Sequence, residues 1–354
     1  MRTILIMKIL LIEDKDEWNS FIAQHATPDG GFLQSWQWGE FQKSYGRQIF
    51  RVVLIENDEI ICGWQIIEMN LPLGMKYWYG PRVITQSAKL KAQNQSLKLK
   101  TFISEIIKIA EKEKAIFIRV DAGDDSLKDF GFIKTKLSIQ PQEELILDIT
   151  KPIEQLLAEM KPKARYNIKV AEKHNIKIFN FSPYGGSPAG GQLPIFKDGL
   201  SSFLGLVEKT SARQGIKAHP KDYYKKMIEI LSQDKTAILY AAKHENKIIA
   251  ANLMTYFNGV ATYLHGGSDD DYKNLMAPYL LHWQAILDAK NKGFNYYNFG
   301  GVSEQKPNWQ GITRFKTGFA PQTFFTKYGG VWDLPVEKIK YSIYKILKAI
   351  SHKL

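Results

Sequence analysis

The sequence predicts a mixed α/β fold built from two similar halves. Two observations support this: the same order of elements occurs twice along the chain, and each copy places apolar strands around one amphipathic helix. The length of 354 residues fits two domains, and 44% hydrophobic with 24% charged residues is a globular composition. We expect a first domain over residues 1–150 and a second over residues 151–332, with a C-terminal helix at 333–354 that can pack on the first.

The N-terminal apolar stretch from Ile4 to Ile12 predicts a buried strand. It is too short for a membrane span, and no small-residue cleavage site of a secretory signal follows it. Cys62 is the only cysteine, which excludes an intrachain disulfide and fits a reducing compartment. The expected location is therefore the cytoplasm.

The first copy of the repeat covers residues 49–123. Residues 49–69 predict a strand pair with a turn at Glu56–Asp58, and residues 76–83 predict a third strand. Residues 101–114 then predict a helix, and residues 115–123 predict a last strand.

The second copy repeats this order over residues 237–301. A strand pair at 237–257 turns at Glu245–Asn246, and residues 260–268 predict the third strand. A helix at 277–293 and a strand at 294–301 complete the copy.

The segment between the two copies is predicted to hold additional elements. Residues 152–174 predict a helix with Ile153, Leu156, Leu157 and Met160 on one face, and Pro152 and Pro162 are acceptable at first-turn positions. Residues 182–194 predict a flexible Gly/Pro loop, since they lack the Lys-Ser/Thr of a phosphate-binding P-loop. Residues 195–210 predict a second helical piece.

Several kinds of chemistry are not supported by the sequence. The histidines show no HExxH or similar ligand spacing, there is no GxSxG motif, and Cys62 lies in an apolar strand. We therefore expect no metal site and no covalent nucleophile. The net charge of 48 − 36 = +12 favours an acidic partner such as a phosphate, a nucleic acid or an anionic membrane, without choosing among them.

The strand, strand, helix, strand unit resembles the GNAT acyltransferase fold. Acetyl-CoA enzymes of that fold hold the pyrophosphate at a Gly-rich turn before the central helix. Here the corresponding stretch, Lys273 to Pro278, has no glycine, and Pro278 has no N–H to donate. The layout of an acyltransferase is thus predicted without the means to hold coenzyme A.

Six collinear stretches spread over almost the whole chain resemble the FemABX family of peptidoglycan bridge-forming aminoacyl ligases. They are FLQSWQWGEFQKSYG (32–46), KPKARYNIKVAEKHNIKI (161–178), TSARQGI (210–216), YLHGGS (263–268), GFNYYNFGGV (293–302) and GITRFKTGFAPQTFFTKYGGVWDLP (311–335). Each motif is modest alone, but six in order are strong.

The resemblance implies two GNAT-like domains in tandem, without the coiled-coil arm of some members. It also implies transfer of an amino acid from aminoacyl-tRNA to the stem-peptide amine of UDP-MurNAc-pentapeptide or lipid II, forming an interpeptide bridge. A monomer that needs no cofactor is expected, in the cytoplasm or at the inner face of the membrane. Two alternatives stay open: an N-acyltransferase with another activated donor, and an inactive GNAT-like binding protein.

The resemblance also implies roles for individual residues. Phe315 and Lys316 match the family's Phe-Lys pair at the aminoacyl-tRNA end of the channel, where the lysine would act on the oxyanion or a terminal phosphate. Arg213 matches the arginine that grips the diphosphate of the precursor, and Ser211 can add a hydroxyl. Tyr263 matches an aromatic residue at the bottom of the substrate cleft. For each residue, an ordinary packing or surface role is the alternative.

The sequence departs from the family pattern at two places in its first half. The lysine that some relatives carry after the tryptophan motif is Gln42 here, with Lys43 as a possible substitute, and Trp38 is expected to shape the cleft wall. No acidic residue occurs between Arg82 and Lys100, so no carboxylate base is predicted.

The predicted C-terminal helix has an apolar side and a basic side. The apolar residues at helical spacing are Ile339, Ile343, Leu347, Ile350 and Leu354, and the lysines are Lys338, Lys340, Lys345, Lys348 and Lys353. Docking of this helix on the protein body is the favoured interpretation. Contact with a tRNA or with an anionic lipid surface is the alternative.

Overall fold

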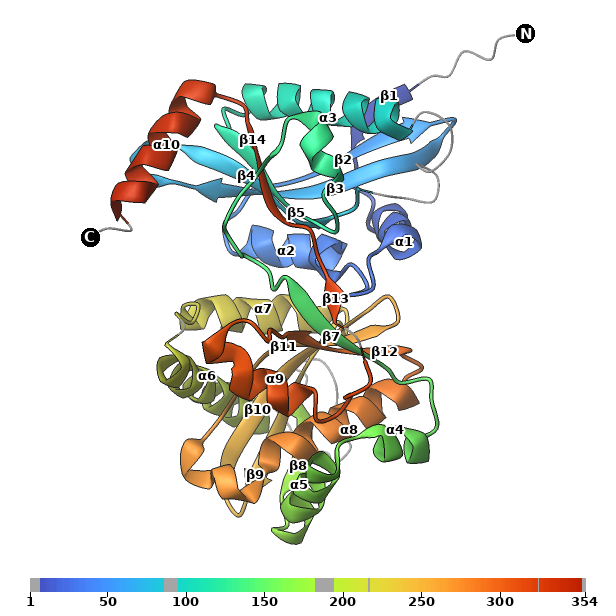
Figure 1. Ribbon diagram of the computed structural model, residues 1–354, viewed down its shortest axis with the longest axis vertical. Coiled ribbons are helices and arrows are strands. Elements are labelled where there is room, and N and C mark those ends of the chain that lie inside the picture. Colours follow the sequence, from blue (N-terminus) through green and yellow to red (C-terminus); the bar gives the residue numbers. More distant parts are fainter. Residues whose placement is uncertain (1–6, 86–94, 182–193, 216, 324, 352–354) are drawn as a thin grey trace. The chain divides into compact units, whose positions relative to one another are not determined.

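The computed structural model describes residues 7–85, 95–181, 194–215, 217–323 and 325–351 (Figure 1). The chain divides into two compact units. Unit 1 comprises Met1–Thr27, Gly31–Gln142 and Lys327–Leu354, and unit 2 comprises Pro28–Gly30 and Glu143–Thr326. Each unit contains one seven-stranded sheet flanked by helices, which confirms the predicted mixed α/β class.

The sheet of unit 1 contains the first copy of the repeat. Its strands in spatial order are β1 (Met7–Leu11), β2 (Ile49–Glu56), β3 (Glu59–Asn70), β4 (Lys76–Val83), β5 (Phe117–Ala122), β14 (Gly330–Pro335) and β6 (Ile133–Lys134). β4 and β5 run parallel, whereas β5 and β14 run antiparallel. The predicted strands at 49–69, 76–83 and 115–123 are confirmed.

Helices cover both faces of this sheet (Figure 1). α3 (Gln95–Lys112) packs on one face, where Phe102 joins Val52 and Leu54 of β2 in a buried cluster. α1 (Lys15–His25) and α2 (Trp36–Ser44) lie on the other face, and α10 (Lys338–Ser351) packs at Phe117. The alternating side chains of β2 thus serve two different helix layers.

The N-terminal strand differs from its prediction. Residues 1–6 lie outside the described residues, and the strand β1 spans Met7–Leu11 at the edge of the sheet, paired to β2 alone. Leu10 is 48% exposed and Leu11 is 54% exposed, so the expectation of a buried strand was wrong. An edge strand has only one neighbour, and an apolar sequence does not reveal that position.

The sheet of unit 2 contains the second copy. Its strands in spatial order are β13 (Thr326–Lys327), β7 (Glu143–Asp148), β12 (Tyr296–Gly301), β11 (Val260–Ser268), β10 (Lys247–Phe257), β9 (Ala237–His244) and β8 (Lys177–Phe181). α8 (Ala277–Asn291) covers one face, backed by α4 (Ile153–Glu159) and α5 (Pro162–Lys173). α6 (Pro194–Gln214) and α7 (Lys221–Gln233) pack on the opposite face.

The remaining elements are short. α9 (Gln310–Lys316) follows β12 in unit 2. Short 3-10 helices lie in the connections at Phe32–Gln34, Pro72–Gly74, Ser126–Phe130, Asp270–Leu275 and Pro307–Trp309. Of the described helices, α6 is the longest at 21 residues, so no coiled-coil arm occurs in the described part of the chain.

Each sheet includes one strand that the predicted domain boundaries assign, in whole or in part, to the other domain. β7 ends before residue 150 but pairs with β12 of the second sheet, and β14 begins before residue 333 but pairs with β5 of the first. The two units therefore divide at residues 142 and 326, rather than at the predicted positions 150 and 332. β7 runs antiparallel to β12, the last strand of the second copy, and β14 runs antiparallel to β5, the last strand of the first copy.

The predicted helix at 152–174 is two helices. Met160 and Lys161 are extended, with ψ of 149° and 141°, and α5 restarts at Pro162. The ring of a proline disfavours a helical conformation in the residue before it, which explains the break. The predicted Gly/Pro loop at 182–194 lies almost wholly outside the described residues.

Candidate functional site

The second copy of the repeat separates its two parallel strands. β11 and β12 pair only from Val260 to Thr262 with Tyr296 to Asn298. Beyond this point β11 continues along β10 as far as Ser268, while Gly301 of β12 pairs with Glu144 of β7. The two strands therefore diverge at Tyr263, and side chains from other elements enter between them.

Lys316 places its amine at this divergence. It is the last residue of α9, its side chain is buried, and its Nζ donates a hydrogen bond to the carbonyl of Gly301 at 2.7 Å. The Nζ also lies 5.6 Å from the centre of the Tyr263 ring. Burial lowers the pKa of Lys316 to about 7, against an opposing effect of Glu144. Both protonation states are thus accessible near neutral pH.

A buried carboxylate and an amide support the backbone that Lys316 contacts. Asn298 donates to Glu144 Oε2 at 2.8 Å, and its own Oδ1 accepts from the N–H of Gly300 at 2.7 Å. Gly300 has a φ of 70°, in the left-handed region that favours glycine. The sequence motif contained Asn298 and Gly300, but Glu144 lies outside every motif and was missed.

Tyr263, Phe315 and Lys316 meet around one buried histidine. The ring of His282 lies 4.7 Å from that of Tyr263 and 5.4 Å from that of Phe315. Burial lowers the pKa of His282 to about 3, with a further contribution from Lys316, so the ring is neutral. Its Nδ1 is 2.8 Å from the hydroxyl of Tyr297. His282 therefore acts as a packing centre for three of the residues predicted from sequence.

The environment of Tyr263 keeps its phenol protonated. Burial raises the pKa of Tyr263 to about 12. A Cβ on Gly266 would lie 2.7 Å from the Tyr263 hydroxyl and 2.4 Å from Asn252 Oδ1, so the missing side chain makes room for both. Among the described residues, the Tyr263 hydroxyl makes no hydrogen bond, so it can donate one to a substrate.

Arg213 and Ser211 lie at the opposite end of β11. Both are in the last turn of α6, and Thr210 beside them accepts a hydrogen bond from the N–H of Ser268 at 3.1 Å. Ser268 is five residues beyond Tyr263, or about 17 Å along a strand. Arg213 is exposed and pairs with the exposed Asp270 at 3.2 Å. Unit 2 thus carries two separate groups of predicted residues.

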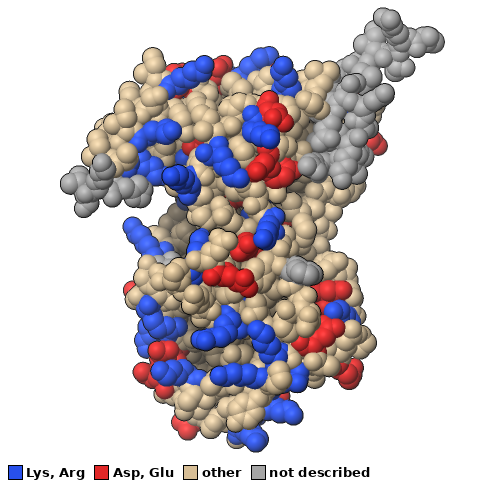
Figure 2. All heavy atoms as spheres, viewed as in Figure 1, with Lys and Arg blue, Asp and Glu red and all other residues tan. Residues whose placement is uncertain are grey.

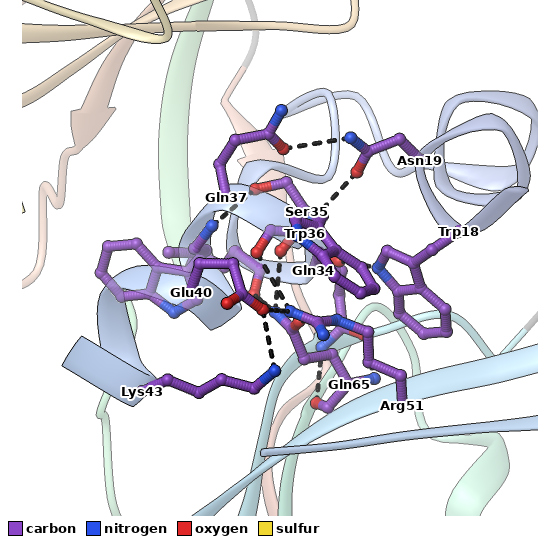
Figure 3. Close-up of polar contacts among 12 residues, drawn as sticks. Trp18, Asn19, Gln34, Ser35, Trp36, Gln37, Glu40, Lys43, Arg51 and Gln65 are labelled. Atoms are coloured by element: carbon purple, nitrogen blue, oxygen red, sulfur yellow. Dashed lines mark hydrogen bonds and ion pairs between the residues drawn. The ribbon is translucent and has the colours of Figure 1, made fainter. Parts of the chain in front are cut away.

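Lys43 and Trp38 belong to unit 1, on α2. Lys43 is exposed, and its Nζ lies 3.0 Å from Glu40 Oε1 (Figure 3). Trp38 is only 7% exposed and packs edge-on against Phe32 and Phe41, at 5.5 and 5.2 Å between ring centres. Its indole therefore fixes α2 in the core.

A buried polar network holds α2 in position (Figure 3). Arg51 donates to Gln65 Oε1 at 2.8 Å and to Glu40 Oε1 at 3.0 Å, and its guanidinium lies 3.6 Å from the centre of the Trp36 ring. A Cβ on Gly39 would lie 2.2 Å from Arg51 Nη2, so only glycine fits there. These contacts of Trp36, Gly39 and Glu40 hold α2, the helix that carries Lys43, in place.

The first copy fills its own strand divergence. After Gly80 the β4–β5 pairing is interrupted and resumes between Val83 and Ala122. Arg82, at the interruption, is buried, lies 3.1 Å from Asp121 Oδ1 and stacks over Tyr328. An internal ion pair thus lies at the strand interruption of the first copy.

A cavity of about 900 Å³ in unit 2 is not lined by Lys316, although its lining residues Lys209 and Asp269 neighbour Thr210 and Ser268 near Arg213. Elements α6, α8 and the β8–β10 edge line it, and none of the residues predicted from sequence is among its lining residues. Lys209 and Lys247 lie there, but both contact Asp269, at 3.3 and 3.0 Å. We therefore place the candidate site at Lys316 and not in this cavity.

The burial of Lys316 predicts a pH-dependent stability difference. The Lys316 amine has a pKa of about 7 in the folded chain and about 10.5 in the unfolded chain. Between pH 7 and pH 10.5 the unfolded chain therefore binds one proton more than the folded chain. Wild-type stability then rises with pH in this window. Lys316→Met cannot titrate, so its stability relative to wild type should be highest at pH 6 and fall towards pH 9. Urea unfolding at several pH values measures this, and a constant difference would contradict the burial.

Comparisons with known proteins agree with this architecture. The model of the FemAB family matches residues 129–244 and 235–349. The lipid II:glycine glycyltransferase of Staphylococcus haemolyticus is 22% identical over 416 aligned positions, covering 94% of each chain. The aminoacyltransferase FemB of Staphylococcus epidermidis is 30% identical over 132 residues, or 35% of this chain and 31% of FemB.

Two solved structures share the fold. The crystal structure of FemX has a TM-score of 0.78 at 18% identity, covering 95% of this chain and 99% of FemX. A tandem GNAT protein from the clavulanic acid biosynthesis pathway has a TM-score of 0.55 at 8% identity, covering 94% of this chain and 99% of its own. The predicted tandem GNAT-like fold is thereby confirmed.

Proposed function

The chain belongs to the FemAB family, and on that premise we propose that it transfers an amino acid from an aminoacyl-tRNA to a stem-peptide amine of a peptidoglycan precursor. Its relatives include a glycyltransferase and an aminoacyltransferase, so the chain is a transferase. The acceptor is UDP-MurNAc-pentapeptide or lipid II, and the product begins an interpeptide bridge.

The buried amine of Lys316 is the observation that carries this proposal. An aminoacyl ester is already activated, so the enzyme must bring the amine to the ester carbonyl and stabilise the oxyanion that forms. The Lys316 Nζ, held by the Gly301 carbonyl at 2.7 Å, donates to that oxyanion in its protonated form. Tyr263 can donate a second hydrogen bond from across the strand divergence.

The reaction needs no redox step or further reactant. Attack forms a C–N bond between the stem-peptide amine and the ester carbonyl, and the attacking nitrogen loses a proton. Collapse of the tetrahedral intermediate breaks the ester C–O bond. The terminal ribose hydroxyl of the tRNA leaves with a proton, and Phe315 offers an aromatic face for the terminal adenine.

The start of α8 supports a donor other than coenzyme A. Met276 precedes the helix with a φ of 55°, and Pro278 occupies the first turn. A proline has no N–H for a pyrophosphate, and no glycine lets the backbone approach one closely. The terminal adenosine of a tRNA carries no pyrophosphate, so it does not require these backbone N–H contacts.

Arg213 is assigned to the diphosphate of the acceptor, with Ser211 two residues before it on α6. Arg213 pairs with Asp270, which is itself exposed, so exchange of that carboxylate for a phosphate costs little. The separation of about 17 Å between Tyr263 and Ser268 along β11 suits an extended acceptor whose diphosphate and amine are far apart.

Arg213→Ala should weaken binding of UDP-MurNAc-pentapeptide about ten- to a hundredfold, because one charge-assisted phosphate contact is lost. Isothermal titration calorimetry measures the affinity. Lys225→Ala, which removes an exposed lysine paired with Asp222 on α7, is the matched control and should leave it unchanged. Equal affinity of Arg213→Ala and wild type would remove Arg213 from the site.

One assay tests the proposed function against its alternatives. The purified chain is incubated with charged tRNA, acetyl-CoA or aminoacyl-CoA, and with UDP-MurNAc-pentapeptide or lipid II, and products are identified by mass. An aminoacylated precursor made from charged tRNA supports the proposal. Product from a CoA donor alone indicates another N-acyltransferase, and binding of the precursor with no product from any donor indicates a binding protein.

A further inference from the structure

The C-terminal helix α10 is attached to unit 1 through one face only. Tyr341 is 6% exposed and donates a hydrogen bond to Asp333 Oδ2 at 2.9 Å. The rings of Tyr341 and Tyr344 lie 5.2 and 4.9 Å from that of Phe117 on β5. Asp333 also pairs with the buried Arg119 at 2.7 Å, so the docked face of α10 is anchored in the core.

The opposite face of α10 is aliphatic and open to solvent. Its exposed side chains are Ile339 (77%), Ile343 (45%), Ile346 (60%), Leu347 (42%) and Ile350 (53%). At about 100° per residue these five fall within an arc of roughly 100°, and Tyr341 lies on the far side of the helix. Among the described residues, no other helix presents such a row of large exposed aliphatic side chains.

Basic residues border this aliphatic row. The residues of α10 include four lysines and no acidic residue. On the helical wheel Lys340 falls on one flank of the row, and Lys338 and Lys345 fall on the other. In Figure 2 the molecular edge formed by α10 is mostly tan, with blue basic spheres beside it. An aliphatic stripe between lysines is the pattern of a helix that lies in a lipid–water interface.

We propose that α10 docks on an anionic lipid bilayer, with its aliphatic row among the acyl chains and its lysines at the acidic headgroups. The charge pattern selects this partner. A second copy of the same helix would bring lysines against lysines, whereas an anionic surface attracts each of them. None of the described helices is long and apolar enough to span a bilayer.

This inference goes beyond the transfer reaction, because it concerns where the enzyme works rather than what it joins. The aliphatic row shares no residue with the site around Lys316 or with Arg213. A lipid-linked acceptor would then be met at the surface where the protein is held. A soluble acceptor would be processed equally well by free and bound protein.

Sedimentation of the full chain with vesicles tests the proposal. We expect binding to vesicles that mix phosphatidylglycerol with phosphatidylcholine, and much weaker binding to vesicles of phosphatidylcholine alone. The double variant Ile339→Ser with Ile346→Ser should reduce binding at least tenfold. Both residues are more than half exposed, so the fold is retained. Leu73→Ser, at a residue that is 83% exposed on unit 1, is the matched control and should bind like wild type.

The double variant Lys338→Gln with Lys340→Gln tests the contribution of the lysine charges to vesicle binding. We expect this pair to weaken binding to the anionic vesicles severalfold and to reduce its salt dependence. Equal binding to both vesicle types, or unchanged binding of the isoleucine variant, would overturn the proposal. A dimer in light scattering that the isoleucine variant abolishes, without vesicle binding by wild type, would assign the row to a second copy instead. Transfer to soluble UDP-MurNAc-pentapeptide should be unaffected in every variant, so failure of the proposed function is seen separately.

Discussion

We expect Lys316→Met to lower the turnover number of aminoacyl transfer by about a hundred- to a thousandfold, while the affinity for the acceptor stays within about twofold. Methionine fills much of the same buried space but offers no donor to the oxyanion. The hydrogen bond of the Nζ to the Gly301 carbonyl and its contact with the Tyr263 ring do not involve Arg213, so loss of the amine leaves the acceptor contact at Arg213 intact.

Lys290→Met is the matched control for this variant. The Lys290 amine also donates to backbone carbonyls, those of Ile149 and Thr150 at 2.9 and 3.1 Å, but it lies on α8 away from the strand divergence. We expect its kcat to remain within twofold of wild type. Steady-state kinetics with calorimetric affinities measures both variants. Parallel losses in kcat and acceptor binding for Lys316→Met would show that Lys316 binds the acceptor and does not act on the transition state.

Gly267→Ala should be the most destabilising single-methyl change in unit 2. A Cβ at this position would lie 2.3 Å from the carbonyl oxygen of Leu206 and 2.5 Å from its carbonyl carbon. Both are backbone atoms of α6, so the whole helix has to move away from β11. Overpacking of this kind costs about 3 kcal/mol, equal to a fall in Tm of roughly 6–12 °C for a unit of this size.

Gly205→Ala is the control, placed on the same helix one residue before Leu206. A Cβ there meets no atom within 4 Å, and alanine gains up to about 1 kcal/mol over glycine in a helix. Thermal unfolding followed by circular dichroism should therefore show opposite shifts for the two variants. Equal Tm values would mean that α6 does not pack closely on β11 at Gly267.

The strands of both repeats could be predicted from sequence because each carries its own evidence. Alternating apolar residues and a polar turn define a hairpin locally, as at Glu56–Asp58 and Glu245–Asn246. The exchange of β7 and β14 could not be predicted in this way. A short apolar segment predicts a strand, but the sequence of that segment does not determine which other strand it pairs with, because this depends on the packing of the whole chain.

The residues of the candidate site divide in the same manner. Lys316, Phe315 and Tyr263 could be named from motifs, but the motif did not indicate that His282 would bring them together or that Lys316 would be buried. Glu144 was missed because the carboxylate was sought after Arg82, in the first half of the chain. It reaches the site through the pairing of β7 with β12, which local pattern does not encode.

The break at Pro162 shows the limit of reading prolines by position alone. The sequence pattern predicted Pro162 as a first-turn residue within one helix spanning 152–174. Pro162 is the first residue of α5. The same ring disfavours a helical conformation for Lys161, which is extended. Met160, directly before it, is extended as well and ends α4, so α5 starts a separate helix.

Transfer of a radiolabelled amino acid in a single turnover shows whether the chain moves an amino acid from tRNA to the precursor and whether Lys316 is needed for this step. Charged tRNA bearing the label is mixed with excess enzyme and precursor, and the label is followed by chromatography. We predict that wild type moves it from tRNA to the precursor within seconds to minutes, and that Lys316→Met leaves it on the tRNA over the same time. Label that stays on the tRNA with wild type, or equal transfer by both proteins, would contradict the account.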